Sequence, residues 1–191
     1  MEGVIRAESD SIASHSFCVT LISYLTALQL QNKFQGISCK KVLEMAVLHD
    51  LAESITGELS SGFKSWVRNR TNSENLLEEI EHEVLEILLE GIYEKEKGEL
   101  AKLLVEFDKC ESKESKIVRF ADAVDAFAFA KVHLGKIFEK NLDSVKTKLR
   151  SGNNNDAIFL GEKLAKWLDD LCNNWDEIDM RRLSRSDSKS K

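Results

Sequence analysis

The stretch Val47-Leu48-His49-Asp50-Leu51-Ala52-Glu53 decides how the rest of this sequence is interpreted. Apolar residues recur through it at helical spacing, and Ser38 is a suitable N-cap, so we predict a helix from Ser38 to about Thr56-Gly57. His49 and Asp50 are ionisable groups in an apolar helix, and burying them is costly unless something compensates, most simply a metal ion. The alternative is a hydrogen-bonded pair with a structural role.

Glu53 follows His49 by four residues, so both side chains should leave the same face of the predicted helix, one turn apart. Asp50 is rotated by about 100° from His49, so the two can converge only on something that lies between them. The arrangement predicts a bound cation with a carboxylate beside it.

Composition predicts the fold class. The chain has 191 residues and no proline, and it is rich in helix-forming residues. We therefore expect an all-α protein, a single-domain helical bundle of about six to seven helices over residues 1–179, followed by a basic disordered tail at 180–191. The expected helices are residues 11–28, 38–56, 72–92, 98–110, 116–130, 142–150 and 157–178.

Charge and cysteine content exclude several classes of protein. The net charge of −6 gives no reason to expect a nucleic acid polymer as partner. No apolar run approaches the length of a membrane span, so we expect no membrane association. The four cysteines are scattered without CxxC spacing, as expected for reduced thiols in a cytoplasmic protein.

Two more candidate ligands lie in predicted helices. His15 is in the first turns of the first helix, where a backbone carbonyl could equally satisfy it. Asp122 is surrounded by apolar residues, so it should be paired or ligated. Arg119, three residues earlier, could be that partner, and Asp125 lies three residues later on the same stripe. His133 lies about 16 Å along the helix from Asp122, too far to share a metal.

The segment that follows the His-Asp doublet is basic. It carries Lys64, Arg68 and Arg70, which suit a phosphate ligand but are equally typical of a solvated loop.

Three segments together resemble the HD superfamily of metal-dependent phosphohydrolases, which is named for the doublet. They are Asp10-Ser-Ile-Ala-Ser-His15-Ser, Leu48-His-Asp-Leu-Ala-Glu-Ser-Ile-Thr-Gly-Glu58-Leu and Ile117-Val-Arg-Phe-Ala-Asp122-Ala-Val-Asp125. Their combination is similar to the compact 5′-deoxynucleotidase branch, the YfbR-like HD proteins. The resemblance spans roughly residues 4–135 and implies an HD-type helical bundle.

The resemblance implies a metal site formed by His15, His49, Asp50 and Asp122. This nitrogen–oxygen ligand set suits one divalent cation, Mn, Co, Fe, Ni or Zn, with Mg also possible. Asp50 and Glu53 are the implied catalytic residues, with Glu53 orienting or deprotonating the attacking water. The alternative for Glu53 is an acid that holds a histidine proton.

The implied reaction releases phosphate from nucleoside 5′-monophosphates, with deoxyribonucleotides as the expected substrates. Candidate substrate contacts are Arg6, Glu58, Lys64, Arg119 and Asp125. This chain departs from the family pattern at Ser14, where the family has glutamate, and at Glu58, where it has aspartate. The family's Arg-Trp element has no match before His15, and Arg6 is the candidate to replace part of it.

Two other functions stay open: hydrolysis of a nucleoside triphosphate or signalling nucleotide, and a metal-stabilised binding module without turnover. We also expect a homodimer, because family members of this size tend to pair and the last helix carries Trp167, Leu168, Leu171 and Trp175. Burial inside one subunit explains those residues equally well.

Overall fold

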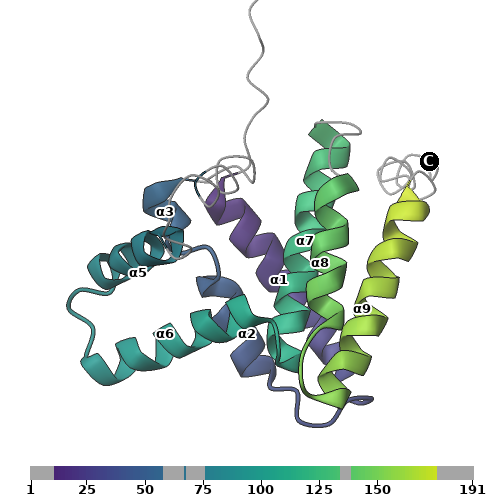
Figure 1. Ribbon diagram of the computed structural model, residues 1–191, viewed down its shortest axis with the longest axis horizontal. Helices are drawn as coiled ribbons and strands as arrows, with labels where there is room; N and C mark the ends of the chain where they lie inside the picture. The colour runs from purple at the N-terminus through teal and green to yellow at the C-terminus, as the bar shows by residue number, and fades with distance from the viewer. Residues whose placement is uncertain (1–10, 58–66, 68–75, 134–138, 176–191) are drawn as a thin grey trace, which may run out of the picture.

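A computed structural model describes residues 11–57, 67, 76–133 and 139–175. These residues form helices and no strand, which confirms the all-α prediction (Figure 1). The helices are α1 (Ile12–Leu30), α2 (Cys39–Leu48), α3 (Glu53–Thr56), α5 (Leu76–Leu88), α6 (Glu94–Lys109), α7 (Lys113–His133), α8 (Glu139–Arg150) and α9 (Asn155–Asn173). The predicted basic tail and residues 72–75 of the predicted third helix lie outside the described residues.

The predicted helix start at Ser38 is confirmed, and Ser11 caps α1 in the same way. The side chain of Ser11 accepts a hydrogen bond from the backbone N–H of Ser14, and that of Ser38 accepts one from Lys41. Each cap satisfies a backbone donor that the first helical turn leaves free. Ser38 therefore fixes where the helix that leads to His49 begins.

The single helix predicted from Ser38 to Thr56 is wrong, because the structure divides it. α2 ends at Leu48, and turns closed by hydrogen bonds between residues three apart lead into α3. In one of them the Glu53 N–H donates to the Asp50 carbonyl at 3.0 Å. The His49 ring accounts for the break: its Nδ1 lies 2.8 Å from the Ala46 carbonyl, the acceptor that a continuing helix would offer to residue 50. His49 and Glu53 are therefore not one turn apart on a single helix.

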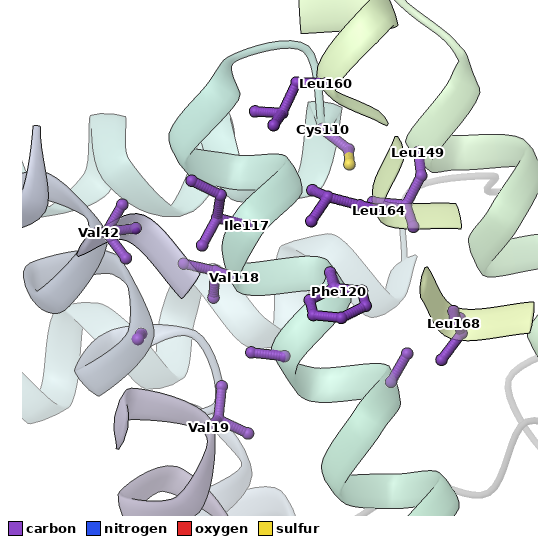
Figure 2. Close-up of a cluster of buried hydrophobic side chains, with 14 of the residues drawn as sticks. Val19, Val42, Cys110, Ile117, Val118, Phe120, Leu149, Leu160, Leu164 and Leu168 are labelled. Atoms are coloured by element: carbon purple, nitrogen blue, oxygen red, sulfur yellow. The ribbon is translucent and has the colours of Figure 1, made fainter. Parts of the chain in front are cut away.

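Helix α7 lies at the centre of the bundle. It contacts α1 and α2 on one side and α8 and α9 on the other, and α6 also packs against it. Figure 2 shows Ile117 and Val118 of α7 between Val42 of α2 and the leucines of α9. All of these apolar side chains are fully buried. Because Asp122 lies on this central helix, the core determines its position relative to α1 and α2.

The C-terminal end of α8 is held by a buried lysine of α7. The Lys116 ammonium donates hydrogen bonds to the carbonyls of Leu149 at 2.7 Å and Ser151 at 2.6 Å, and a longer one to Lys148 at 3.4 Å. These carbonyls lie in the last turn of α8 and just beyond it, where the helix offers few donors. The Lys148 carbonyl also accepts a hydrogen bond from the Ser151 hydroxyl at 2.7 Å. Gly161 lets α9 approach this end of α8 closely, because a Cβ there would lie 1.8 Å from the Leu149 oxygen.

Helix α9 packs inside the subunit. Leu168 is fully buried, the Trp167 ring lies 6.2 Å from that of Phe120, and the Trp175 ring lies 5.3 Å from that of Phe127, both between centroids. Of the two explanations for these large apolar residues, burial within one subunit is the one that the structure supports.

Helix α1 corrects the expectation about membrane-length segments. It has 19 residues, and an 18-residue window of it reaches a mean hydropathy of 1.2, which is long and apolar enough to cross a membrane by length and composition alone. Interspersed serine, threonine and glutamine residues hide this in the sequence. The helix has no lysine, arginine, aspartate or glutamate, and five large apolar side chains are exposed on it: Phe17, Leu21, Tyr24, Leu25 and Leu28.

Candidate metal centre

Four ionisable side chains that are distant in sequence meet where α1, α2 and α7 come together. His15 comes from the first turn of α1, His49 and Asp50 directly follow α2, and Asp122 lies midway along α7. One ligand atom from each of His15, His49 and Asp122 lies within 4.8 Å of the others. The predicted convergence of the two histidines with Asp122 is therefore present in the structure.

Asp50 lies between the two imidazoles. Its Oδ2 is 3.2 Å from Nε2 of His15 and 3.2 Å from Nε2 of His49, and the two Nε2 atoms are 3.4 Å apart. Oδ1 of Asp122 is 3.6 Å from Nε2 of His15. Nε2 of both histidines and a carboxylate oxygen of Asp122 thus lie close together, and Asp50 lies against both imidazoles. Nitrogen and oxygen donors of this kind are expected for a divalent transition metal.

The other nitrogen of each histidine is occupied. Nδ1 of His49 donates to the Ala46 carbonyl at 2.8 Å, and Nδ1 of His15 donates to Oδ2 of Asp125 at 2.7 Å. In a neutral imidazole, a hydrogen bond of this kind keeps the proton on Nδ1 and leaves the lone pair on Nε2. Both imidazoles are therefore oriented to bind a cation through Nε2, so the residues fit a metal ion.

The charges of the two histidines depend on the neighbouring acids. Burial disfavours the imidazolium form of His15, but hydrogen bonds to Asp125 and Asp50 and the charge of Asp122 outweigh it and raise the pKa of His15 to about 10. Burial also opposes the charge on His49, yet Asp50 and Asp122 raise its pKa. Without a metal, protons provide the positive charge that this cluster of acids requires.

The two acids respond in opposite directions. Burial tends to raise the pKa of Asp50, but His15 and His49 hold it well below the usual range. Burial dominates at Asp122 and raises its pKa, against the opposing charges of Arg119 and His49. Side-chain exposure is 18% for His15, 22% for Asp50 and 26% for Asp122, so the cluster is partly exposed.

Arg119 makes the pairing with Asp122 that the sequence left open. Its Nη1 lies 3.5 Å from Oδ2 of Asp122, and its Nη2 lies 3.8 Å from Oδ1 of Asp108. The pairing uses the oxygen of Asp122 that is not the one near His15. Arg119 therefore pairs with Oδ2 of Asp122, and Oδ1 of the same carboxylate still faces His15.

The remaining predicted site residues are distributed as follows. Glu53 is half-buried in the first turn of α3, three residues after Asp50. Arg6, Glu58 and Lys64 lie outside the described residues, as do Arg68 and Arg70 of the basic segment. Because α7 runs unbroken to His133, the exclusion of that histidine on grounds of distance holds.

Sequence reasoning placed Asp125 with the substrate, whereas in the structure it contacts His15. Its spacing of three residues from Asp122 was a usable signal, since both leave the same face of α7. Phe107 of α6 was missed altogether. Its ring centroid lies 5.5 Å from that of His49, and a phenylalanine in an amphipathic helix gives no sign of such a contact.

Comparisons with known proteins address the family and the fold of the chain. A family model described as 5′-deoxynucleotidase YfbR-like matches residues 2–166. A 5′-deoxynucleotidase from Erwinia tasmaniensis is 28% identical over 124 residues, which cover 64% of this chain and 60% of that protein. The chain thus matches less than two thirds of that relative's length.

Solved structures share the fold. A conserved hypothetical protein from Pyrococcus furiosus has a TM-score of 0.56 and 24% identity, covering 82% of this chain and 84% of its own. The PH0347 protein from Pyrococcus horikoshii has a TM-score of 0.52 and 27% identity, covering 86% and 82%. A protein from Magnetospirillum magnetotacticum titled a predicted metal-dependent phosphohydrolase has a TM-score of 0.51 and 15% identity, covering 83% and 76%.

Proposed function

Since the chain belongs to the YfbR-like 5′-deoxynucleotidase family, we propose that it is a metal-dependent phosphomonoesterase that hydrolyses nucleoside 5′-monophosphates, with deoxyribonucleotides as the preferred class. The products are the nucleoside and inorganic phosphate. The observation that supports the proposal is the cluster of His15, His49 and Asp122, in which Asp50 lies 3.2 Å from Nε2 of each imidazole.

His15, His49, Asp50 and Asp122 would hold one divalent cation. When bound, such a cation lowers the pKa of a water molecule and offsets phosphate charge. Mn, Co, Fe, Ni and Zn suit this mixture of nitrogen and oxygen donors, and Mg suits it less well.

The protein's own groups have separate tasks in this proposal. Asp50 lies against both imidazoles and belongs to the centre itself. Glu53 begins α3, and its backbone N–H donates a hydrogen bond to the Asp50 carbonyl at 3.0 Å. This hydrogen bond fixes the backbone of Glu53 relative to that of Asp50. Glu53 is the proposed base that orients the attacking water and accepts its proton.

Substrate contacts are proposed for Arg6, Glu58 and Lys64. Arg119 is a weaker candidate than the sequence indicated, because its guanidinium is engaged by Asp122, Asp108 and the Phe107 carbonyl. A phosphate would have to compete with those partners. Asp125 likewise is better explained as the partner of His15 than as a contact to the sugar.

The proposal is tested with a panel of 5′-mononucleotides, in deoxyribose and ribose forms, after metal removal and re-addition of single divalent ions. We expect phosphate release that depends on the added ion and is faster with deoxyribonucleotides. Pyrophosphate or triphosphate release from nucleoside triphosphates would support the alternative substrate class. Absence of turnover with every ion, in protein that binds metal, would support a binding module.

We also propose that two copies pair, through the outer face of α1 rather than through α9. The outer face is the stripe Phe17, Leu21, Tyr24, Leu25 and Leu28, of which Phe17 is 68% exposed. A surface helix normally carries charge on its outer side, and this one carries none. Two such stripes face to face would bury on the order of 800 Å² in total, at the low end for a specific interface, so the dimer should dissociate on dilution.

Sedimentation velocity over a range of concentrations tests this pairing. Leu21→Glu should give a monomer at concentrations where the parent protein is dimeric. Ile87→Glu changes an apolar residue on α5 that is more exposed than Leu21, and it should not alter assembly. A monomeric parent protein, or one whose α1 face binds phosphatidylcholine vesicles instead of a second copy, would contradict the proposal.

A further inference from the structure

Helix α6 contributes no ligand to the candidate metal centre, yet one of its side chains contacts two parts of it. Phe107 lies in the last turn of α6 and is 4% exposed. An ion pair of 2.7 Å between Lys41 and the neighbouring Glu106 joins α2 to this end of α6. The ion pair fixes the last turn of α6 against α2, and the Phe107 ring lies beside His49, which follows α2.

One contact of the Phe107 ring is with His49. The two rings meet edge to face, at 73° with centroids 5.5 Å apart, and the His49 side chain is fully buried. The Ala46 carbonyl fixes one edge of the imidazole through Nδ1. The aromatic contact adds a second restraint on the orientation of the same imidazole.

The other contact is with Arg119. The guanidinium carbon lies 3.8 Å from the centroid of the Phe107 ring, within cation–π distance, and Nη2 donates to the Phe107 carbonyl at 3.5 Å. Nη1 of the same guanidinium lies 3.5 Å from Oδ2 of Asp122. The side chain and the carbonyl of one residue thus hold the arginine that pairs with Asp122.

We propose that Phe107 is a positioning residue of the metal centre. Its ring sets the orientation of His49 directly and that of the Asp122 carboxylate through Arg119, so one residue of α6 aligns ligands from two other parts of the chain. This inference rests on the proposed metal site. It predicts that the aromatic character of residue 107 matters for metal affinity beyond its contribution to the core.

Phe107→Met tests this, because it keeps an apolar side chain of similar volume and removes the aromatic face. Phe120→Met is the matched control: Phe120 is 7% exposed on α7, and its ring packs against Trp167. Co²⁺ is titrated into metal-free protein and followed by its visible absorption. We expect Phe107→Met to weaken Co²⁺ binding about 10-fold, the size expected for losing a group that orients a ligand, and to alter the absorption spectrum. Phe120→Met should leave both unchanged.

Two further variants separate the possible outcomes. Arg119→Lys keeps the charge but loses the planar group, and it should weaken Co²⁺ binding in the same direction. Phe107→Tyr keeps the aromatic face and should bind Co²⁺ within about twofold of the parent protein. Equal affinities and spectra for Phe107→Met and Phe120→Met would overturn the inference. A parent protein that binds no Co²⁺ would instead overturn the proposed metal site.

Discussion

Nδ1 of His15 lies 2.7 Å from Oδ2 of Asp125, which is one turn beyond Asp122 on α7. The aspartate accepts a hydrogen bond from the Nδ1–H of the imidazole and directs Nε2 towards Asp50 and Asp122. Metal-binding histidines commonly have such a carboxylate partner, which makes the imidazole a better donor.

Replacing Asp125 should therefore weaken metal binding more than substrate binding. We expect Asp125→Ala to weaken divalent metal affinity by about 10- to 100-fold, and Asp125→Asn, whose amide oxygen can still accept the proton, to have a smaller effect. Competition with a chromogenic chelator measures this. Unchanged metal affinity with a raised KM would return Asp125 to the substrate-binding role inferred from the sequence.

Glu53 is expected to act in catalysis and not in metal binding. Glu53→Gln keeps the size of the side chain and removes the base, so kcat should fall by about 10²-fold or more while metal content stays at the parent level. Metal content and turnover are measured on the same preparation. Loss of metal together with activity would show that Glu53 supports the ligands instead.

The helix content and the N-cap at Ser38 could be predicted from sequence, because cap residues and apolar spacing are local signals. The break after Leu48 could not, since it depends on a hydrogen bond from the His49 ring to its own helix. Nor could the role of Phe107, which depends on where α6 crosses α2 and α7. The local pattern identifies ionisable residues among apolar ones, but the partners of those residues depend on packing between segments that are distant in the sequence.

Gly161 should be essential to the packing of α8 on α9. A methyl group there would lie 1.8 Å from the Leu149 oxygen, so the backbone must shift, and we expect Gly161→Ala to lower the free energy of unfolding by about 1–3 kcal/mol. Gly98→Ala, in α6 with no atom within 4 Å of the new methyl, should raise it by up to about 1 kcal/mol. Urea denaturation of both variants measures the difference; equal effects would contradict the close approach.

Lys116 should stabilise the fold without a carboxylate partner among the described residues. Burial lowers the pKa of its ammonium, yet the group binds carbonyls at the end of α8. Lys116→Met leaves those carbonyls without a donor, and we expect a loss of about 1–3 kcal/mol in the free energy of unfolding. Lys40→Met, at an exposed position of α2, is the control and should change nothing measurable. A stability of Lys116→Met equal to that of the control would contradict this role.

The central claim is that His15, His49, Asp50 and Asp122 bind one metal ion together. The most direct test is elemental analysis of protein purified without chelator, comparing the parent chain with Asp50→Ala and Asp122→Ala. We predict close to one equivalent of a divalent transition metal in the parent chain and a sharp loss in both variants, which should remain folded by circular dichroism. A parent chain without metal that also takes up none on dialysis against Mn²⁺, Co²⁺ or Zn²⁺ would contradict the claim.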